Sequence, residues 1–323
     1  MKPKILVTRR ILPEALAFLD ERTELEVVPA ECSLPREALI EKIRDKEGLL
    51  SLLLDVVDGE VMDAAPRLRI IANCAVGYNN IDIARARRRG ILVTNTPGVL
   101  TEATADLTWG LILAVARRIP SAERLLREGG FRGWAIDLGL GKDVFGKRLG
   151  IIGMGRIGKA VARRAVGFRM ETVYFDPVPL APGDEHDLAA RFMPLDELLR
   201  TSDIVTIHAA LSPETGHLIS KERIAMMKRE SILVNVARGP IVDESALADA
   251  LAAERIWGAG LDVYEREPDV DRRLLSLENA VLLPHIGSAT YETRLAMSMM
   301  AARNLVQGLS GEKPTNLIPE MEE

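Results

Sequence analysis

The stretch GIIGMGRIG, residues Gly150–Gly158, decides the fold of the larger part of this chain. It reads as the end of a buried strand followed by the start of a helix. Gly153 permits a tight turn, Gly155 lets the backbone approach a pyrophosphate, and Gly158 lets the helix pack closely on the strand. A helix N-terminus also attracts phosphate charge. The stretch favours a dinucleotide site over a purely structural turn, and we expect this site to contain Gly153, Gly155, Arg156, Ile157 and Gly158.

A carboxylate follows this loop at the spacing that a dinucleotide site requires. The next expected strand ends at Asp176, 18 residues after Gly158. A carboxylate in this position accepts hydrogen bonds from both ribose hydroxyls and repels a 2′-phosphate. The following residues, Pro177–Leu180, supply no basic side chain for such a phosphate. The sequence therefore favours NAD(H) as the cofactor and leaves NADP(H) possible.

Strand patterns alternate with helical patterns on both sides of the glycine loop, which predicts an α/β fold with two doubly wound parallel sheets. Several strands are continuous apolar runs, as expected for strands buried on both faces. Before the loop the expected strands are Lys4–Thr8, Leu25–Pro29, Gly48–Leu53, Arg69–Cys74 and Ile91–Asn95. From the loop onwards they are Arg148–Gly153, Glu171–Asp176, Ile204–Ala209, Ser231–Ala237, Gly258–Tyr264 and Ala280–Pro284.

Two long helical patterns suggest how the two sheets are distributed along the chain. One runs from Thr101 to Arg118, with Pro120 just past its expected end. The other runs from about Tyr291 to Gln307, after the last strand of the second block. A helix that returns after the second block predicts a discontinuous first domain, residues 1–98 and 288–323. Residues 99–287 then form the inserted second domain.

Composition and charge exclude several classes of protein. The chain has 323 residues and a net charge of −5 at pH 7, so it lacks the basic surface that nucleic-acid binding requires. Its two cysteines, Cys32 and Cys74, favour a reducing compartment over a disulfide framework. No apolar run is long enough for a membrane span. The four histidines show no metal-binding spacing. We expect a soluble cytoplasmic protein without a metal site.

Three ionisable residues follow strands of the second block. A nicotinamide enzyme that acts on a carbonyl needs a proton donor, a group that keeps the donor charged, and a cation for an acidic substrate. His285, Glu267 and Arg238 match these needs. Because parallel strands place their carboxyl ends at one edge, the three side chains could converge there. Each also has a structural interpretation, respectively as a loop histidine, a turn residue before a proline and a surface charge.

Together the motifs resemble those of the D-isomer-specific 2-hydroxyacid dehydrogenase family over nearly the whole chain. Within this family the sequence is most similar to the glyoxylate and hydroxypyruvate reductase branch. The matching stretches are NCAVGYNNID (Asn73–Asp82), TPGVLTEATAD (Thr96–Asp106), GIIGMGRIG (Gly150–Gly158), VNVARGPIVDE (Val234–Glu244), GLDVYEREP (Gly260–Pro268) and LPHIGSAT (Leu283–Thr290).

The resemblance implies a role for each matching residue. Arg238 would bind the substrate, and His285 would be the acid and base, hydrogen-bonded to Glu267. Asp262 would hold the nicotinamide carboxamide. The other residues implied around the substrate are Leu53, Val76, Gly77 and Trp134. The other residues implied around the cofactor are Thr104, His208, Val236, Ala237, Arg238, His285 and Gly287.

The resemblance also implies the wider setting. It implies a flavodoxin-like substrate domain, a Rossmann domain and a homodimer formed by the segment from Thr101 to Trp134, with Trp134 at the partner's substrate pocket. The expected activity is reduction of a small 2-oxoacid, glyoxylate or hydroxypyruvate. The alternatives are a phosphoglycerate or D-lactate type of dehydrogenase and a non-catalytic, NAD-sensing corepressor. The tail Gly311–Glu323 leaves no room for the regulatory domain of long phosphoglycerate dehydrogenases, and Glu267 stands where formate dehydrogenases carry glutamine.

Overall fold

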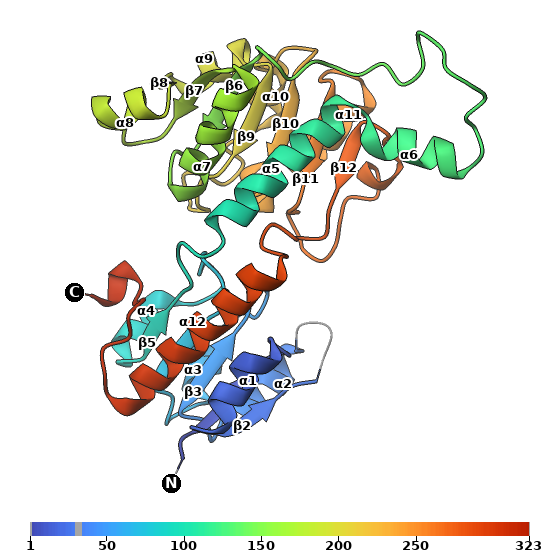
Figure 1. Cartoon of the computed structure of the whole chain (residues 1–323). Coiled ribbons are helices and arrows are strands. Elements are labelled where there is room, and N and C mark those ends of the chain that lie inside the picture. Colours follow the sequence, from blue (N-terminus) through green and yellow to red (C-terminus); the bar gives the residue numbers. More distant parts are fainter. Residues whose placement is uncertain (1, 30–33, 323) are drawn as a thin grey trace. The chain divides into compact units, whose positions relative to one another are not determined.

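The computed structural model describes residues 2–29 and 34–322, so Cys32 lies outside the described part. The chain divides into two compact units. Unit 1 consists of Met1–Leu100 and Ser288–Glu323, and unit 2 consists of Thr101–Gly287. Each unit is built around one parallel sheet with helices on both of its faces (Figure 1). The predicted α/β class with two parallel sheets is confirmed.

Unit 1 contains a five-stranded sheet in the order β2-β1-β3-β4-β5, which is the flavodoxin-like order. Its strands are β1 (Lys4–Val7), β2 (Glu24–Val27), β3 (Gly48–Ser51), β4 (Ile70–Asn73) and β5 (Leu92–Thr94). One face packs on α1 (Pro13–Asp20) and α12 (Tyr291–Ser310). The other packs on α2 (Arg36–Ile43), α3 (Gly59–Asp63) and α4 (Ile83–Arg88). Side chains alternate along β1, so Ile5 and Val7 pack on one face and Leu6 on the other.

Unit 2 contains a seven-stranded sheet in the order β12-β11-β10-β9-β6-β7-β8, a Rossmann order extended by one strand. Its strands are β6 (Arg148–Ile152), β7 (Glu171–Phe175), β8 (Ala190–Phe192), β9 (Ile204–Ile207), β10 (Ile232–Asn235), β11 (Gly258–Leu261) and β12 (Ala280–Leu282). Helices α5 (Thr101–Ala116) and α7 (Arg156–Ala165) cover one face. Helices α9 (Leu195–Thr201), α10 (Lys221–Met226) and α11 (Glu244–Ala252) cover the other.

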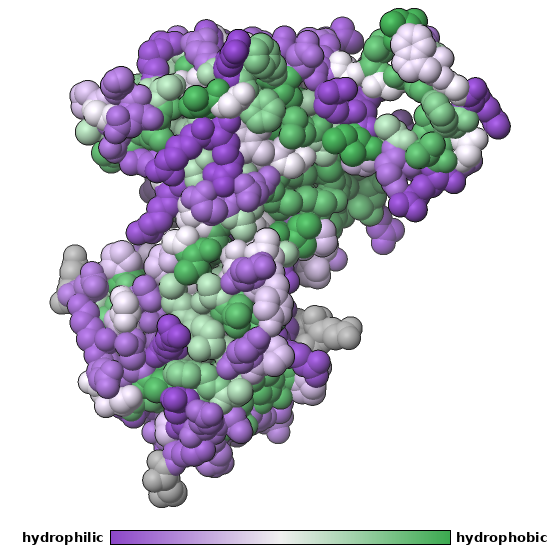
Figure 2. Space-filling model, viewed as in Figure 1, coloured by the Kyte–Doolittle hydropathy of each residue, from purple (hydrophilic) through white to green (hydrophobic). Residues whose placement is uncertain are grey.

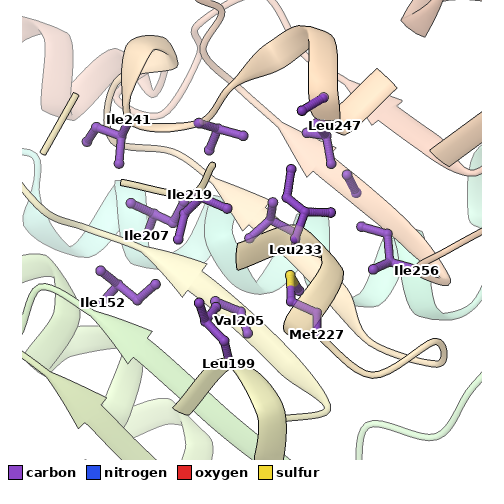
Figure 3. Close-up of a cluster of buried hydrophobic side chains, with 14 of the residues drawn as sticks. Ile152, Leu199, Val205, Ile207, Ile219, Met227, Leu233, Ile241, Leu247 and Ile256 are labelled. Atoms are coloured by element: carbon purple, nitrogen blue, oxygen red, sulfur yellow. The ribbon is translucent and has the colours of Figure 1, made fainter. Parts of the chain in front are cut away.

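The buried cluster under the second group of helices holds the central strands of unit 2 in place. Figure 3 shows Ile152, Val205 and Leu233 from neighbouring strands facing Leu199 of α9 and Leu247 of α11. Each of these five side chains is at most 1% exposed. Burial of a side chain of this size contributes about 1.5–3 kcal/mol. This packing fixes the strand ends from which the polar loops of unit 2 emerge.

One local expectation was wrong, and one strand was not expected. The first long helix ends at Ala116 rather than at Arg118, and Pro120 does not stop it. Arg118 takes a left-handed conformation, and Pro120 lies in the first turn of a new helix, α6 (Ile119–Arg127). Proline is favoured there because the N–H groups of a first turn have no partner within the helix. The sequence also failed to indicate β8, a three-residue edge strand without β-branched residues.

None of the described helices combines the length and the apolar composition that a membrane-spanning helix needs.

Candidate active site

Unit 2 brings two of the three predicted catalytic side chains into direct contact. Arg238, Glu267 and His285 lie in the loops that follow β10, β11 and β12, which are neighbours in the sheet. Nδ1 of His285 lies 2.8 Å from Oε2 of Glu267. The backbone N–H of Tyr264 donates to Oε1 of Glu267 at 3.0 Å. A carboxylate therefore orients the imidazole, and the Nε2 side of the ring is left for other partners.

The charges of these residues support one another. Burial by itself raises the pKa of Glu267, but its interactions with His285, the N–H of Tyr264 and the charge of Arg238 together outweigh burial and hold this pKa below its usual value. Burial lowers the pKa of the Arg238 guanidinium, and the charge of Glu267 opposes that effect. Glu267 therefore presents a carboxylate to Nδ1 of His285, and Arg238 places a half-buried cation in the neighbouring loop.

The loop after β10 is fixed by an asparagine and a glycine. Asn235 donates from Nδ2 to the carbonyl of Arg238 at 2.9 Å and accepts the N–H of Ala237 at 3.0 Å. A Cβ on Gly239 would lie 1.8 Å from the carbonyl oxygen of Tyr264, so no larger residue fits there. The loop of Arg238 therefore packs directly on the backbone of the loop that carries Glu267.

Buried polar groups also hold the loop of His285. His285 has a φ of 53°, a left-handed conformation that costs a non-glycine residue about 1 kcal/mol or more. Asp262 accepts the N–H groups of Ile286 and Gly287, each at 2.7 Å. Burial raises the pKa of Asp262, and these two hydrogen bonds oppose the rise. The hydroxyl of Tyr264 donates to the carbonyl of Leu283 at 2.9 Å. These bonds offset the strain of the loop.

The glycine loop has the shape that a dinucleotide pyrophosphate needs. Gly153 has a φ of +91°, and a Cβ there would lie 2.6 Å from the nitrogen of Ala209. A Cβ on Gly158 would lie 2.2 Å from the carbonyl oxygen of Gly153. A Cβ on Gly155, by contrast, would meet nothing within 4 Å, so open space adjoins the N-terminus of α7. Oδ2 of Asp176 accepts the N–H of Met154 at 2.9 Å. The residues present fit a dinucleotide.

Further predicted cofactor residues lie at the same end of unit 2. Oγ1 of Thr104, on α5, donates to the carbonyl of Gly287 at 3.3 Å. His208 follows β9, and its Nε2 lies 3.0 Å from Oγ1 of Thr206. Nδ1 of His208 is buried and has no hydrogen-bond partner among the described residues. The remaining residues of this group are Arg156 and Ile157 at the start of α7, and Val236 and Ala237 after β10.

Unit 1 carries the predicted substrate residues Leu53, Val76 and Gly77 at the carboxyl edge of its own sheet. Asn73 donates to the carbonyl of Gly77 at 2.9 Å, and Asn95 donates to that of Val76 at 2.8 Å. The N–H groups of Val76 and Gly77 have no acceptor in residues 2–29 and 34–322. Two adjacent unpaired N–H groups can receive a carboxylate.

Trp134 lies in an extended part of unit 2. Every residue from 122 to 141 is exposed, and the side chain of Trp134 is 82% exposed. Helix α6 and the segment after it project away from the sheet of this unit (Figure 1). The structure therefore does not bring Trp134 to the other predicted residues of its own unit.

Sequence reasoning did not identify Asn235, Asn73 and Tyr264, which help to hold these loops. Asn235 and Asn73 each close an otherwise apolar strand, β10 and β4. A polar residue at the carboxyl end of a buried strand is the signal that could have found them. Tyr264 gave no such signal. Burial raises the pKa of its phenol to about 12, so this hydroxyl stays a hydrogen-bond donor at neutral pH.

A cavity of about 370 Å³ lies at the opposite ends of the strands. It is bordered by Trp257 and Asn279, which precede β11 and β12, and by Pro120 of α6. The Trp257 ring lies 4.5 Å from the guanidinium of Arg118 and 4.6 Å from Nζ of Lys142. This cavity contains none of the predicted catalytic residues, because these follow the strands rather than precede them.

The amino-acid sequence of this chain is similar to a known protein family and to known enzymes. Residues 109–287 match the family model described as D-isomer specific 2-hydroxyacid dehydrogenase, NAD binding domain. A protein of Thermococcus kodakarensis named glyoxylate reductase is 50% identical over 98% of this chain and 96% of its own length.

Two solved structures are similar over the same extent. A protein from Thermus thermophilus is 45% identical, with a TM-score of 0.91 over 98% of this chain and 99% of that chain. An NADPH-dependent glyoxylate/hydroxypyruvate reductase from Sinorhizobium meliloti, in complex with NADP and malonate, is 35% identical. Its TM-score is 0.88 over 99% of this chain and 98% of that chain.

The buried His208 predicts a pH dependence of stability. Burial lowers the pKa of His208 to about 3, whereas a histidine in an unfolded chain titrates near pH 6.5. Its contribution to stability is therefore present above about pH 6.5 and is lost as the pH falls towards the folded pKa, because the unfolded chain gains the proton first. We expect a loss of roughly 2 kcal/mol in the free energy of unfolding between about pH 6.5 and about pH 5.

Urea denaturation at both pH values measures this loss. His208→Asn should reduce it, whereas His186→Asn, at an exposed position of α8 (Pro182–Asp187), should leave it unchanged. If wild type and His208→Asn lose the same free energy of unfolding between the two pH values, the loss does not come from His208.

Proposed function

Because the chain belongs to the D-isomer specific 2-hydroxyacid dehydrogenase family, we propose that it reduces small 2-oxoacids to D-2-hydroxyacids. Glyoxylate and hydroxypyruvate are the foremost substrates of this proposal, since relatives named for these activities match nearly the whole chain. The family that the motifs predicted is thereby confirmed. The observation that carries the proposed activity is the 2.8 Å hydrogen bond between His285 and Glu267, in loops next to that of Arg238.

The roles of these side chains follow from their charges. When bound, the reduced nicotinamide supplies the hydride that the carbonyl carbon of the substrate receives. Protonated His285, held through Nδ1 by Glu267, gives the Nε2 proton to the carbonyl oxygen. Arg238 offsets the negative charge of the substrate. In the oxidative direction neutral His285 accepts the hydroxyl proton, and Glu267 stabilises the imidazolium that forms.

In unit 1, we assign the unpaired N–H groups of Val76 and Gly77 to the binding of a carboxylate. Leu53, in the turn after β3, adds an apolar side chain to the same edge. Unit 2 would hold the cofactor on the glycine loop, and Asp176 would bind the ribose and Asp262 the nicotinamide carboxamide. Each oxygen of Asp262 already accepts one backbone N–H and keeps a second lone pair for this contact.

The test is a panel of 2-oxoacids assayed with NADH and NADPH in wild type and Arg238→Lys. We expect turnover of glyoxylate and hydroxypyruvate by wild type and loss of most of it in Arg238→Lys. A planar guanidinium makes two parallel hydrogen bonds to a carboxylate, and an ammonium cannot reproduce them. NADH binding, followed by fluorescence, should persist in the variant. A wild type that is inactive across the panel would contradict the proposed function, and near-normal kcat/KM in Arg238→Lys would remove Arg238 from the substrate site.

The His285–Glu267 pair predicts how the rates depend on pH. Glu267 is an anion with a lowered pKa, so its charge favours the protonated imidazole. Glu267→Gln removes this charge. Reduction requires the protonated ring, so its kcat/KM should begin to fall at a lower pH in the variant. Oxidation requires the neutral ring, so its rate should begin to rise at a lower pH as well.

Profiles of kcat/KM against pH in both directions check this prediction. His285→Gln is the reference, with an expected loss of about 10²–10⁴ in reduction. The pH at which reduction falls and the pH at which oxidation rises should both be lower in Glu267→Gln. If neither changes, or if they change in opposite directions, Glu267 is not the partner of His285 in the reaction.

For the cofactor we propose a preference for NADH, set by Asp176. Its carboxylate would repel a 2′-phosphate, and Pro177–Leu180 provide no cation. Asp176→Ser combined with Val178→Arg removes the repulsion and supplies a phosphate partner. The ratio of kcat/KM for NADPH to that for NADH should rise by roughly tenfold or more in this double variant. Val178→Arg alone is the matched control, because it retains the repelling carboxylate. A wild type that prefers NADPH would contradict this assignment.

We further propose a homodimer formed through the projecting segment of unit 2. This segment exposes apolar side chains among hydrophilic ones (Figure 2), and exposed apolar surface of this kind marks an association site. The exposed apolar residues are Ile119, Leu125, Leu126, Phe131, Trp134, Ile136, Leu138 and Leu140. In such a dimer Trp134 would reach the substrate pocket of the partner.

Light scattering should give twice the chain mass of 35.5 kDa for wild type. Leu126→Asp combined with Ile136→Asp should give the single-chain mass, because both charges would be buried at the interface. Val166→Asp, at another exposed apolar position of unit 2, should leave the dimer intact. A wild-type protein with the mass of one chain would overturn the dimer.

A further inference from the structure

We propose that Glu244 is a positioning residue: it holds the loop that carries Glu267 and so keeps the Glu267–His285 pair aligned. The inference rests on the proposed function, because it concerns the proton transfer that this pair would perform. Glu244 is the first residue of α11, whereas Glu267 lies in the loop after β11. It touches neither Glu267 nor His285, and it acts on them through backbone N–H groups.

The Glu244 carboxylate binds the loop of Glu267 at two points, one before and one after Glu267. Its Oε2 accepts the N–H of Glu265 at 2.7 Å, and its Oε1 accepts the N–H of Asp271 at 2.8 Å. Both bonds join an anion to a backbone donor, a class of hydrogen bond about twice as strong as a neutral one. One side chain therefore joins the two ends of the segment from Glu265 to Asp271. We call this pair of hydrogen bonds the staple.

The bond to Glu265 is reciprocal. The carboxylate of Glu265 accepts the N–H of Glu244 at 3.3 Å through Oε2, and its Oε1 lies 3.1 Å from Nε2 of His217. Around the staple, the ring of His217 lies beside Glu265, and Arg273 forms an ion pair with Asp271. The helix start and the loop each satisfy a backbone N–H of the other.

The staple matters because the loop has little regular structure of its own. Between the end of β11 at Leu261 and the 3₁₀ turn Leu274–Ser276, the chain forms only an isolated bridge between Arg266 and Asp269. Residues without ladder or helix bonds are held in place by side-chain contacts. Tyr264, whose N–H donates to Glu267, directly precedes Glu265, whose N–H donates to Glu244.

Capping of α11 does not explain these contacts. Asp243 already caps this helix, since its side chain accepts the N–H of Ala246 at 2.9 Å. A glutamate in a first turn gains from the helix dipole without any partner. Glu197, in the first turn of α9, is such a residue: it is exposed, and its side chain has no partner among the described residues. Glu197 therefore provides the matched control.

The kinetic test is a double-mutant cycle of Glu244→Ala and Glu267→Gln, with Glu197→Ala as the control. Glu244→Ala should lower kcat/KM for 2-oxoacid reduction about tenfold, mainly in kcat, because a displaced carboxylate orients the imidazole poorly. The pH at which reduction declines should move lower, in the direction expected for Glu267→Gln. In the Glu267→Gln background, Glu244→Ala should change kcat/KM by less than about twofold. Glu197→Ala should change neither quantity.

A second measurement is independent of activity. Amide hydrogen exchange at Glu265 and Asp271 should become faster in Glu244→Ala and in Glu244→Gln. Gln has only one acceptor oxygen and presents an amide donor to the second N–H. The N–H of Ala246, which donates to the capping side chain of Asp243, should keep its protection from exchange in both variants.

The outcomes separate the two proposals. An inactive wild type would overturn the proposed function, and the exchange of Glu265 and Asp271 would then decide whether the staple exists. Additive effects in the cycle, or a reduction profile that keeps its pH dependence in Glu244→Ala, would show a merely structural role and overturn the positioning of Glu267. Unchanged exchange at Glu265 and Asp271 would overturn the staple itself.

Discussion

The hydrogen bond between Nδ1 of His285 and Oε2 of Glu267 is the interaction on which the candidate site depends. It joins the loops of β11 and β12, each of which leaves the sheet with a conformation that the backbone would not adopt on its own. His285 is left-handed, and the loop of Glu267 lacks regular hydrogen bonding over most of its length. The bond can form only if both loops are held by other groups.

Those groups are buried polar side chains that bind backbone atoms. Asp262 binds the loop of His285, Asn235 binds the loop of Arg238, and Tyr264 touches the loops on both sides of it. Each such contact satisfies a polar atom that would otherwise be buried without a partner, and leaving one unsatisfied costs about 1–3 kcal/mol. The same bonds that keep unit 2 folded therefore also orient the groups that we propose to act in the reaction.

The two units use the same geometric rule for different purposes. Both are parallel sheets, so both gather loops at the carboxyl ends of their strands. In unit 2 these loops present charged side chains and the open space beside Gly155. In unit 1 they present backbone N–H groups, because Asn73 and Asn95 occupy the carbonyls of Val76 and Gly77. Parallel sheets thus gather different groups at their carboxyl edges, ionisable side chains in unit 2 and backbone N–H groups in unit 1.

Local sequence was sufficient for the features that depend on neighbouring residues. The run GIIGMGRIG predicted the strand, turn and helix around Gly153, since those glycines act within a few residues of one another. The apolar runs predicted most strands and the α/β class. Contacts across the chain could not be read in this way. The pairing of Glu267 with His285 was expected from the family resemblance and not from residue spacing. The backbone contact of Gly239 with Tyr264 and the staple from Glu244 join residues that only the strand order brings together. Residue spacing carries local backbone preferences, whereas the distances between loops are set by how the whole sheet packs, and so only the tertiary structure decided them.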